Sequence, residues 1–143
     1  AESLGKKGKG ILPLISEAPK DHHSLLQLYL DGPKDKLFYI FSSEIKDKTK
    51  ITKNNLSTQV QFLKDHSLNQ IKTAQKNAFV KTLVKKKIPF REFKILDFTE
   101  EALGELFSYF MLETALIGKL SNVDPFDQPA VEQVKINTKK LLT

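Results

Sequence analysis

The stretch LFYIF at residues 37–41 decides how the rest of the sequence is interpreted. It is short, continuously apolar and followed by two serines, which is typical of a β-strand. Continuous rather than alternating hydrophobicity indicates a strand that is covered on both faces, as strands in parallel sheets are. Two further runs, Ile11 to Ile15 and Phe93 to Phe98, are predicted as strands, although charged residues interrupt the second.

Helical patterns separate these runs, and their ends carry specific signals. Asp21 can cap a first helix, which ends at Gly32. Ser67 and Gln70 stand at the spacing of a capping box, and apolar residues then recur at helical intervals until a lysine run precedes Pro89. We therefore expect two helices, one on each side of the weakly patterned segment 43–66, whose structure stays open.

Two more helices complete the predicted order. Thr99 caps a third helix whose apolar stripe is so broad that we expect this helix to be largely buried. A last helix starts at Pro129 and extends to about residue 142. Strands that alternate with helices predict an α/β fold, with a mostly parallel sheet flanked by helices in layers.

Length and composition predict one soluble domain over residues 1–143. The chain carries 23 Lys and Arg against 17 Asp and Glu, a net charge of +6, and 40% hydrophobic residues. It contains no cysteine, which excludes disulfides, thiolate nucleophiles and cysteine-bound zinc, so no metal site is expected. Its apolar runs are far shorter than the roughly 20 residues that span a bilayer. With no secretory signal in the first ten residues, a cytoplasmic protein without a membrane partner is expected.

The positive charge does not predict nucleic-acid binding. Arg91 is the only arginine among the 23 basic residues, and arginine is the side chain that reads guanine with two hydrogen bonds. The lysines are scattered, and the single run of three, residues 85–87, lies where a helix is expected to end. Cations complement the helix dipole at that position, so no nucleic-acid partner is expected.

Two segments near the start of the chain carry candidate acid–base groups. Glu2 lies in AESLGK, although an isolated carboxylate is ordinarily only a solvated charge. His22 and His23 lie at a helix N-terminus, where the helix dipole favours a neutral imidazole that can accept a proton. A histidine pair at this position is also common as a simple surface or capping feature.

Gln128 and Lys135, in the last helix, form a second candidate set. Seven residues at 100° each bring the two side chains within about 20° of one helix face, separated by roughly 10 Å along the axis. This distance suits a phosphorylated sugar. Glutamine at a helix start and lysine on a helix surface are nevertheless ordinary.

Three stretches resemble one enzyme family. LGELFSYFMLETALIGKLSNV at 103–123 and PFDQPAVEQVK at 125–135 are similar to the C-terminal signature of glucose-6-phosphate isomerases. HSLLQLYLDGP at 23–33 resembles the family's His-x-x-x-Gln helix, and AESLGK at 1–6 resembles its Glu-Ser-Asn-Gly-Lys motif. The resemblance covers the whole chain and identifies it as the C-terminal part of a larger sugar isomerase, in a domain of that family's layered α/β type.

This resemblance implies a role for each candidate residue. Glu2 corresponds to the base that moves a proton between C2 and C1 of a sugar phosphate through a cis-enediol. His23 corresponds to the residue that assists ring opening, contributed across a dimer interface. Lys135 corresponds to a lysine that contacts the ring oxygen or the hydroxyls of the sugar, and Gln128 to a substrate-binding glutamine. The family uses no cofactor, acts in glycolysis and gluconeogenesis, and forms homodimers.

Some features depart from the family pattern. Leu4 replaces the motif asparagine, and His22 beside His23 leaves open which imidazole acts. The family's phosphate-binding loop and its arginine lie outside this sequence, so we expect the isolated chain to be an inactive fragment. The alternative is a noncatalytic regulatory module that binds sugar phosphates.

Overall fold

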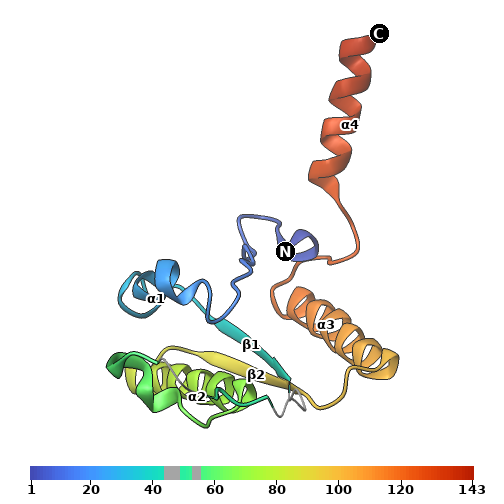
Figure 1. Ribbon diagram of the computed structural model, residues 1–143. Coiled ribbons are helices and arrows are strands. Elements are labelled where there is room, and N and C mark those ends of the chain that lie inside the picture. Colours follow the sequence, from blue (N-terminus) through green and yellow to red (C-terminus); the bar gives the residue numbers. More distant parts are fainter. Residues whose placement is uncertain (44–48, 53–55) are drawn as a thin grey trace. The chain divides into compact units, whose positions relative to one another are not determined.

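A computed structural model describes residues 1–43, 49–52 and 56–143. The chain divides into two compact units. One comprises Ser16–Phe98, and the other combines Ala1–Ile15 with Thr99–Thr143. Figure 1 shows the elements of both, and each unit is described by itself below.

The unit Ser16–Phe98 contains a two-stranded parallel sheet. Strand β1 (Phe38–Ser43) pairs with β2 (Phe90–Ile95), with Phe38 opposite Phe90. Parallel pairing and the α/β class are therefore confirmed. β2 begins three residues before the predicted start and ends at Ile95, so Leu96 to Phe98 are not part of the strand as predicted. Its charged residues lie at exposed positions, and Glu92 forms an ion pair with Lys76 of the neighbouring helix.

The second helix of this unit, α2 (Leu68–Lys86), begins with the predicted capping box. The Ser67 hydroxyl accepts a hydrogen bond from the Gln70 backbone N–H at 3.2 Å, and the Gln70 side-chain oxygen accepts one from the Ser67 N–H at 2.8 Å. Lys87 ends the helix in the left-handed conformation, with φ of 56°. Leu83, on this helix, is fully buried.

Helix α1 (His22–Asp31) follows Asp21, as predicted, but that residue does not cap it with its side chain. The Asp21 carboxylate instead accepts a hydrogen bond from the backbone N–H of Glu17 at 2.6 Å, which holds the preceding turn. At the other end of α1, Asp31 forms an ion pair with Lys86 of α2. The ends of the two helices are thereby joined.

Part of the segment whose structure the sequence left open is a short 3-10 helix, η2 (Thr58–Leu63). It is followed by an isolated antiparallel bridge between Ser67 and Lys50.

The other unit contains a short 3-10 helix, η1 (Glu2–Leu4), and two α-helices, α3 (Glu100–Leu120) and α4 (Pro129–Leu142). The Thr99 hydroxyl caps α3 by accepting a hydrogen bond from the Ala102 N–H at 3.2 Å, as predicted. After α3 the chain turns back on itself, and the N–H of the buried Val123 donates to the carbonyl of Gly118 at 2.9 Å. A side chain on Gly118 would meet that turn, since its Cβ would lie 3.0 Å from the Val123 carbonyl oxygen.

Two sequence predictions for this unit are wrong. Ile11 to Ile15 do not form a strand, and Ile15 is 99% exposed. Helix α3 is not largely buried: its apolar residues are mostly exposed, Met111 to 73%. An apolar pattern produces a buried strand or helix only where another element covers it. Among the described helices of this unit, the short η1 is the one that packs substantially on α3, which leaves most of the apolar stripe uncovered.

Candidate active-site groove

The N-terminal segment carrying Glu2 folds into a compact loop. The Gly5 N–H donates to the Ala1 carbonyl at 2.9 Å, and the Lys6 N–H donates to the Leu4 carbonyl at the same distance. The chain then returns at Gly10, whose φ is 122° and whose Cβ, if present, would lie 2.8 Å from the Gly5 Cα. Only glycine tolerates that conformation and that approach. The loop therefore presents Lys6 and the lysines after it to the segment that follows α3.

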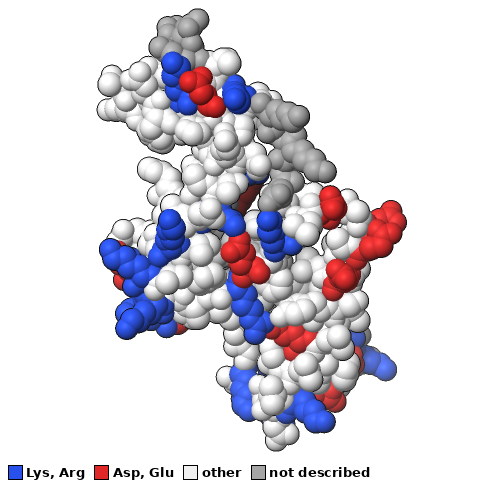
Figure 2. Space-filling view, turned by 90° about the horizontal axis from the view of Figure 1, so that it is seen from below, with Lys and Arg blue, Asp and Glu red and all other residues white. Residues whose placement is uncertain are grey.

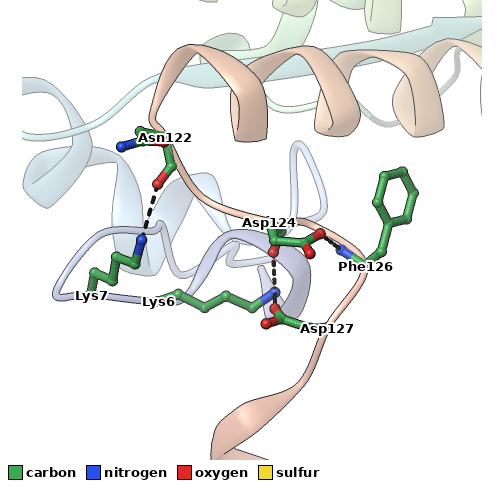
Figure 3. A network of polar contacts seen from close by, with 6 residues as sticks. All are labelled: Lys6, Lys7, Asn122, Asp124, Phe126 and Asp127. Carbon is green, nitrogen blue, oxygen red and sulfur yellow. Dashed lines mark hydrogen bonds and ion pairs between the residues drawn. The ribbon is translucent and has the colours of Figure 1, made fainter.

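Lys6 connects this loop to the residues before α4 (Figure 3). Its ammonium group forms an ion pair with the Asp127 carboxylate, with Nζ and Oδ1 2.6 Å apart, and donates a hydrogen bond to the backbone carbonyl of Asp124. The Lys6 side chain is only 11% exposed, in contrast to most lysines. Because the Lys6 ammonium is shielded from solvent and has two acceptors, its position is better defined than that of a lysine in an ordinary surface ion pair.

Two neighbouring lysines contact backbone carbonyls just beyond the end of α3. Lys7 donates to the Asn122 carbonyl at 3.4 Å, and Lys9 donates to the Ser121 carbonyl at 2.5 Å. A helix C-terminus leaves its last carbonyls unpaired and carries partial negative charge, so ammonium groups stabilise it.

The turn that leads into α4 places Gln128. The Asp124 carboxylate accepts a hydrogen bond from the Phe126 N–H at 2.9 Å, which bends the chain before Asp127 (Figure 3). Gln128 then occupies the N-cap of α4, where its backbone carbonyl accepts a hydrogen bond from Val131 at 3.1 Å. Its side chain takes no part in capping, and it forms no hydrogen bond with the described residues. The Gln128 amide is thus available to a ligand.

Glu2 and Gln128 line the same groove, which has a volume of about 460 Å³. This volume lies in the range of ordinary small-molecule sites. The groove offers a carboxylate, a carboxamide and the paired charges of Lys6 and Asp127. Its lining consists of Glu2, Gly5, Lys6, Lys7, Val123, Asp124, Asp127, Gln128, Pro129, Ala130 and Val131.

Lys135 is not among the residues that line this groove. It lies on α4 and its ammonium pairs with Glu132, with Nζ and Oε1 2.6 Å apart, while its side chain stays 65% exposed. It borders a separate hollow of about 440 Å³ near the chain end. Gln128, with φ of −138° and ψ of 60°, is outside the regular helix, so counting 100° per residue from it does not place the two side chains together.

His23 belongs to the other unit, on α1. Its side chain is exposed, whereas the neighbouring His22 packs against the ring of Phe79, with centroids 5.2 Å apart. One turn beyond His23, the Gln27 amide donates to the Asp31 carboxylate at 3.1 Å. The structure thus places His23 and Gln27 on one open face of the helix.

Within residues 1–43, 49–52 and 56–143, no three His, Asp or Glu side chains are grouped so that they could hold a metal ion. No described helix is both long enough and apolar enough to cross a membrane. On the face seen in Figure 2, basic and acidic side chains are interspersed.

Sequence reasoning did not single out Asp124 or Asp127 and gave Lys6 no function. The Asp-Pro pair at 124–125 was the available signal, since it favours a turn. Nothing local indicated that Lys6 would meet that turn, because Lys6 and Asp124 are 118 positions apart.

Comparisons with known proteins agree with the resemblance. The chain is 33% identical over 146 residues to the probable glucose-6-phosphate isomerase of Methanococcus maripaludis, covering 100% of this chain and 32% of that protein. It is 33% identical over 140 residues to the glucose-6-phosphate isomerase of Methanocaldococcus jannaschii, with 94% and 33% covered. The Mycoplasmopsis pulmonis glucose-6-phosphate isomerase is 36% identical over 153 residues, with 99% and 34% covered.

A solved structure has the same fold. A hypothetical protein from Thermus thermophilus superposes with a TM-score of 0.75 at 30% identity, over 88% of this chain and 31% of that one. No protein-family model matches the chain. The chain spans about a third of the length of the curated relatives reported above. It is therefore related to the glucose-6-phosphate isomerases and corresponds to about one third of such an enzyme.

Proposed function

We propose that this chain acts as the C-terminal part of a glucose-6-phosphate isomerase, which interconverts glucose 6-phosphate and fructose 6-phosphate. The observation that carries the proposal is the shared groove of Glu2 and Gln128. The two motifs lie at opposite ends of the sequence, yet one contributes a proton acceptor and the other a hydrogen-bonding amide to the same space. The similarity to named isomerases supports the same substrate class.

Glu2 would be the general base. Its carboxylate takes the proton from C2, the electron pair of that C–H bond forms the C1–C2 double bond, and the π pair of the C1 carbonyl moves to O1, which takes up a proton to give a cis-enediol. Return of the first proton to C1, with loss of the O2 proton and formation of the C2 carbonyl, completes the isomerisation. The substrate's own carbonyl makes this proton acidic, so the step uses no cofactor.

Gln128, His23 and Lys135 would serve the remaining steps. The Gln128 amide can hydrogen bond a sugar hydroxyl, since it has no other partner among the described residues. His23 would transfer a proton during ring opening, and its exposed position on α1 is compatible with meeting a site on another subunit of a homodimer. Lys135 would face the ring oxygen after exchanging its pairing with Glu132 for the substrate.

The isolated chain is expected to be inactive. Isomerisation also requires the substrate phosphate to be anchored and the enediolate charge to be stabilised, and these contributions account for a large part of enzymatic rate enhancement. In this proposal the other two thirds of the enzyme supply them. The complete enzyme would act in the cytoplasm, in glycolysis and gluconeogenesis.

The test is proton exchange between sugar phosphate and solvent in deuterium oxide. A complete enzyme is assembled by joining this chain to the remaining two thirds of the Methanocaldococcus jannaschii isomerase. We expect this enzyme to incorporate deuterium at C2 of glucose 6-phosphate, and the isolated chain not to do so. Binding of fructose 6-phosphate without any exchange would instead support the noncatalytic regulatory module. Exchange by the isolated chain would show that its site is self-contained.

A further inference from the structure

We infer that Lys6 is a positioning residue, which holds the Glu2 segment and the Gln128 segment at a fixed separation across the groove. The inference rests on the proposed function for its catalytic meaning, but its structural content stands on the contacts of Lys6. No substrate contact is assigned to this lysine.

The first observation is that Lys6 joins both sides of the groove. It follows Glu2 by four residues, and the loop between them is closed by hydrogen bonds from Gly5 to Ala1 and from Lys6 to Leu4. On the other side, its ammonium pairs with Asp127, the residue directly before Gln128, at 2.6 Å. Each end of the connection therefore lies close in sequence to a candidate site residue.

The second observation is that Lys6 has two different partners. Besides the Asp127 carboxylate, it donates to the backbone carbonyl of Asp124, at the start of the same turn (Figure 3). One ammonium group thus contacts both ends of the turn from Asp124 to Asp127, which the hydrogen bond from Phe126 to Asp124 also closes. A turn held at both ends has few alternative conformations, so the Gln128 backbone is fixed with it.

The third observation is burial. The Lys6 side chain is 11% exposed, whereas Asp127 is 55% exposed and the Lys135–Glu132 pair is exposed on both sides. Solvent and salt screen an exposed ion pair and reduce its contribution. A shielded ammonium with two acceptors holds its geometry more firmly, and a small displacement of catalytic groups can reduce a rate by about 100-fold.

The experiment measures this connection without any sugar. The ¹H–¹⁵N signals of the Gln128 side-chain amide are compared between the chain and its Glu2→Gln variant at neutral pH. Because the two side chains share the groove, removing the Glu2 charge should shift these signals. The same comparison is repeated in backgrounds that carry Lys6→Gln, Lys6→Arg or Lys9→Gln.

The shift difference is the change in the Gln128 side-chain amide signals that Glu2→Gln causes. It should vanish in the Lys6→Gln background and be mostly kept in the Lys6→Arg background, where the cation remains. Lys9→Gln is the matched control, because Lys9 also donates to a backbone carbonyl after α3, that of Ser121, which lies outside the turn from Asp124 to Asp127. The shift difference should persist in this control. A shift difference of unchanged size in the Lys6→Gln background, or none in the unmodified chain, would overturn the inference.

If Lys6→Gln prevents folding of this unit, the comparison is made in an Asp127→Asn background instead. Asp127→Asn removes the ion pair with Lys6 and keeps the hydrogen bond from Lys6 to the Asp124 carbonyl. At least a twofold reduction of the shift difference is expected, and no reduction would overturn the inference. The proposed function is tested separately by deuterium exchange. If deuterium is not incorporated but the Gln128 shift difference still depends on Lys6, the proposed isomerisation is rejected and the positioning role of Lys6 stands.

Discussion

His22 and Phe79 pack ring against ring, with centroids 5.2 Å apart and planes inclined by 44°. Phe79 also meets Phe38 of β1 edge to face at 5.8 Å, so His22 completes an aromatic cluster between α1, α2 and the sheet. The next residue, His23, is exposed. Because adjacent residues on a helix point about 100° apart, one imidazole packs inward and the other stays open to a ligand. Of the two histidines, His23 is therefore the one whose imidazole is accessible for the proposed ring opening.

Replacing His22 by alanine should lower the free energy of unfolding. Ring pairs of this kind contribute about 1 kcal/mol beyond the area that they bury. Urea unfolding followed by circular dichroism measures the loss, because the chain has no tryptophan for fluorescence. His66→Ala is the matched control, since His66 is exposed, and its midpoint should not change. Equal midpoints for both variants would contradict a packing role for His22.

Replacing His23 by alanine should affect catalysis rather than stability in the complete enzyme. The unfolding midpoint should stay the same, while enzyme-catalysed ring opening should fall by about 100-fold, as expected when a general acid or base is lost. The exchange of α and β anomers of glucose 6-phosphate, measured by NMR magnetisation transfer, reports ring opening without proton transfer at C2. If anomer exchange stays at the original rate, His23 does not open the ring.

The parts of the fold that were predictable depend on neighbours in sequence. Ser67 and Gln70 contain a complete capping box within four residues, so both hydrogen bonds were foreseeable. Thr99 is a similar case. The role of the Asp21 carboxylate was harder to predict. It can accept a hydrogen bond either from the first turn of α1 or from the turn before it, and in the structure it accepts one from the Glu17 N–H.

The remaining features depend on what lies opposite a residue. Ile11 to Ile15 have the composition of a strand, but a strand forms only against a partner, and none of the described residues pairs with them. The shared groove of Glu2 and Gln128 is likewise a product of tertiary packing. The motif resemblance indicated that both serve one site, while the contact through Lys6 that connects them had no local signal.

The Asp31–Lys86 ion pair should make stability depend on pH. The hydrogen bond and the positive charge of Lys86 hold the pKa of Asp31 below its ordinary value of 3.8, and the Gln27 amide lowers it further. A lowered pKa contributes stability above the unfolded-state value, and this contribution is lost as the pH falls through the folded-state value. Asp31→Asn should therefore show a smaller loss of stability below about pH 4 than the original chain. Urea midpoints measured between pH 6 and pH 3 test this, and parallel curves would contradict it.

Replacing Lys135 by alanine should separate stability from function. Its pair with Glu132 is exposed, and such pairs contribute about 0–1 kcal/mol, so unfolding should change little. In the complete enzyme, the Michaelis constant for fructose 6-phosphate should rise and anomer exchange should slow, because the proposed role is contact with the ring oxygen. Lys139→Ala, one turn later on the same helix, is the control and should have no effect on either measurement. Identical kinetics for the two variants would remove Lys135 from the site.

Replacing Glu2 by glutamine addresses the chemical step directly. The amide keeps the shape of the carboxylate but cannot accept a proton, so isomerisation and deuterium incorporation at C2 should fall by about 10²–10⁴-fold in the complete enzyme. Affinity for fructose 6-phosphate should change little, and anomer exchange should persist because ring opening is assigned to His23. Glu105→Gln is the control, as Glu105 is an exposed carboxylate on α3 that does not line the groove, and it should retain full activity. Undiminished deuterium incorporation in the Glu2 variant would exclude this carboxylate as the base, whereas loss of anomer exchange together with isomerisation would indicate that Glu2 organises the site rather than transferring the proton.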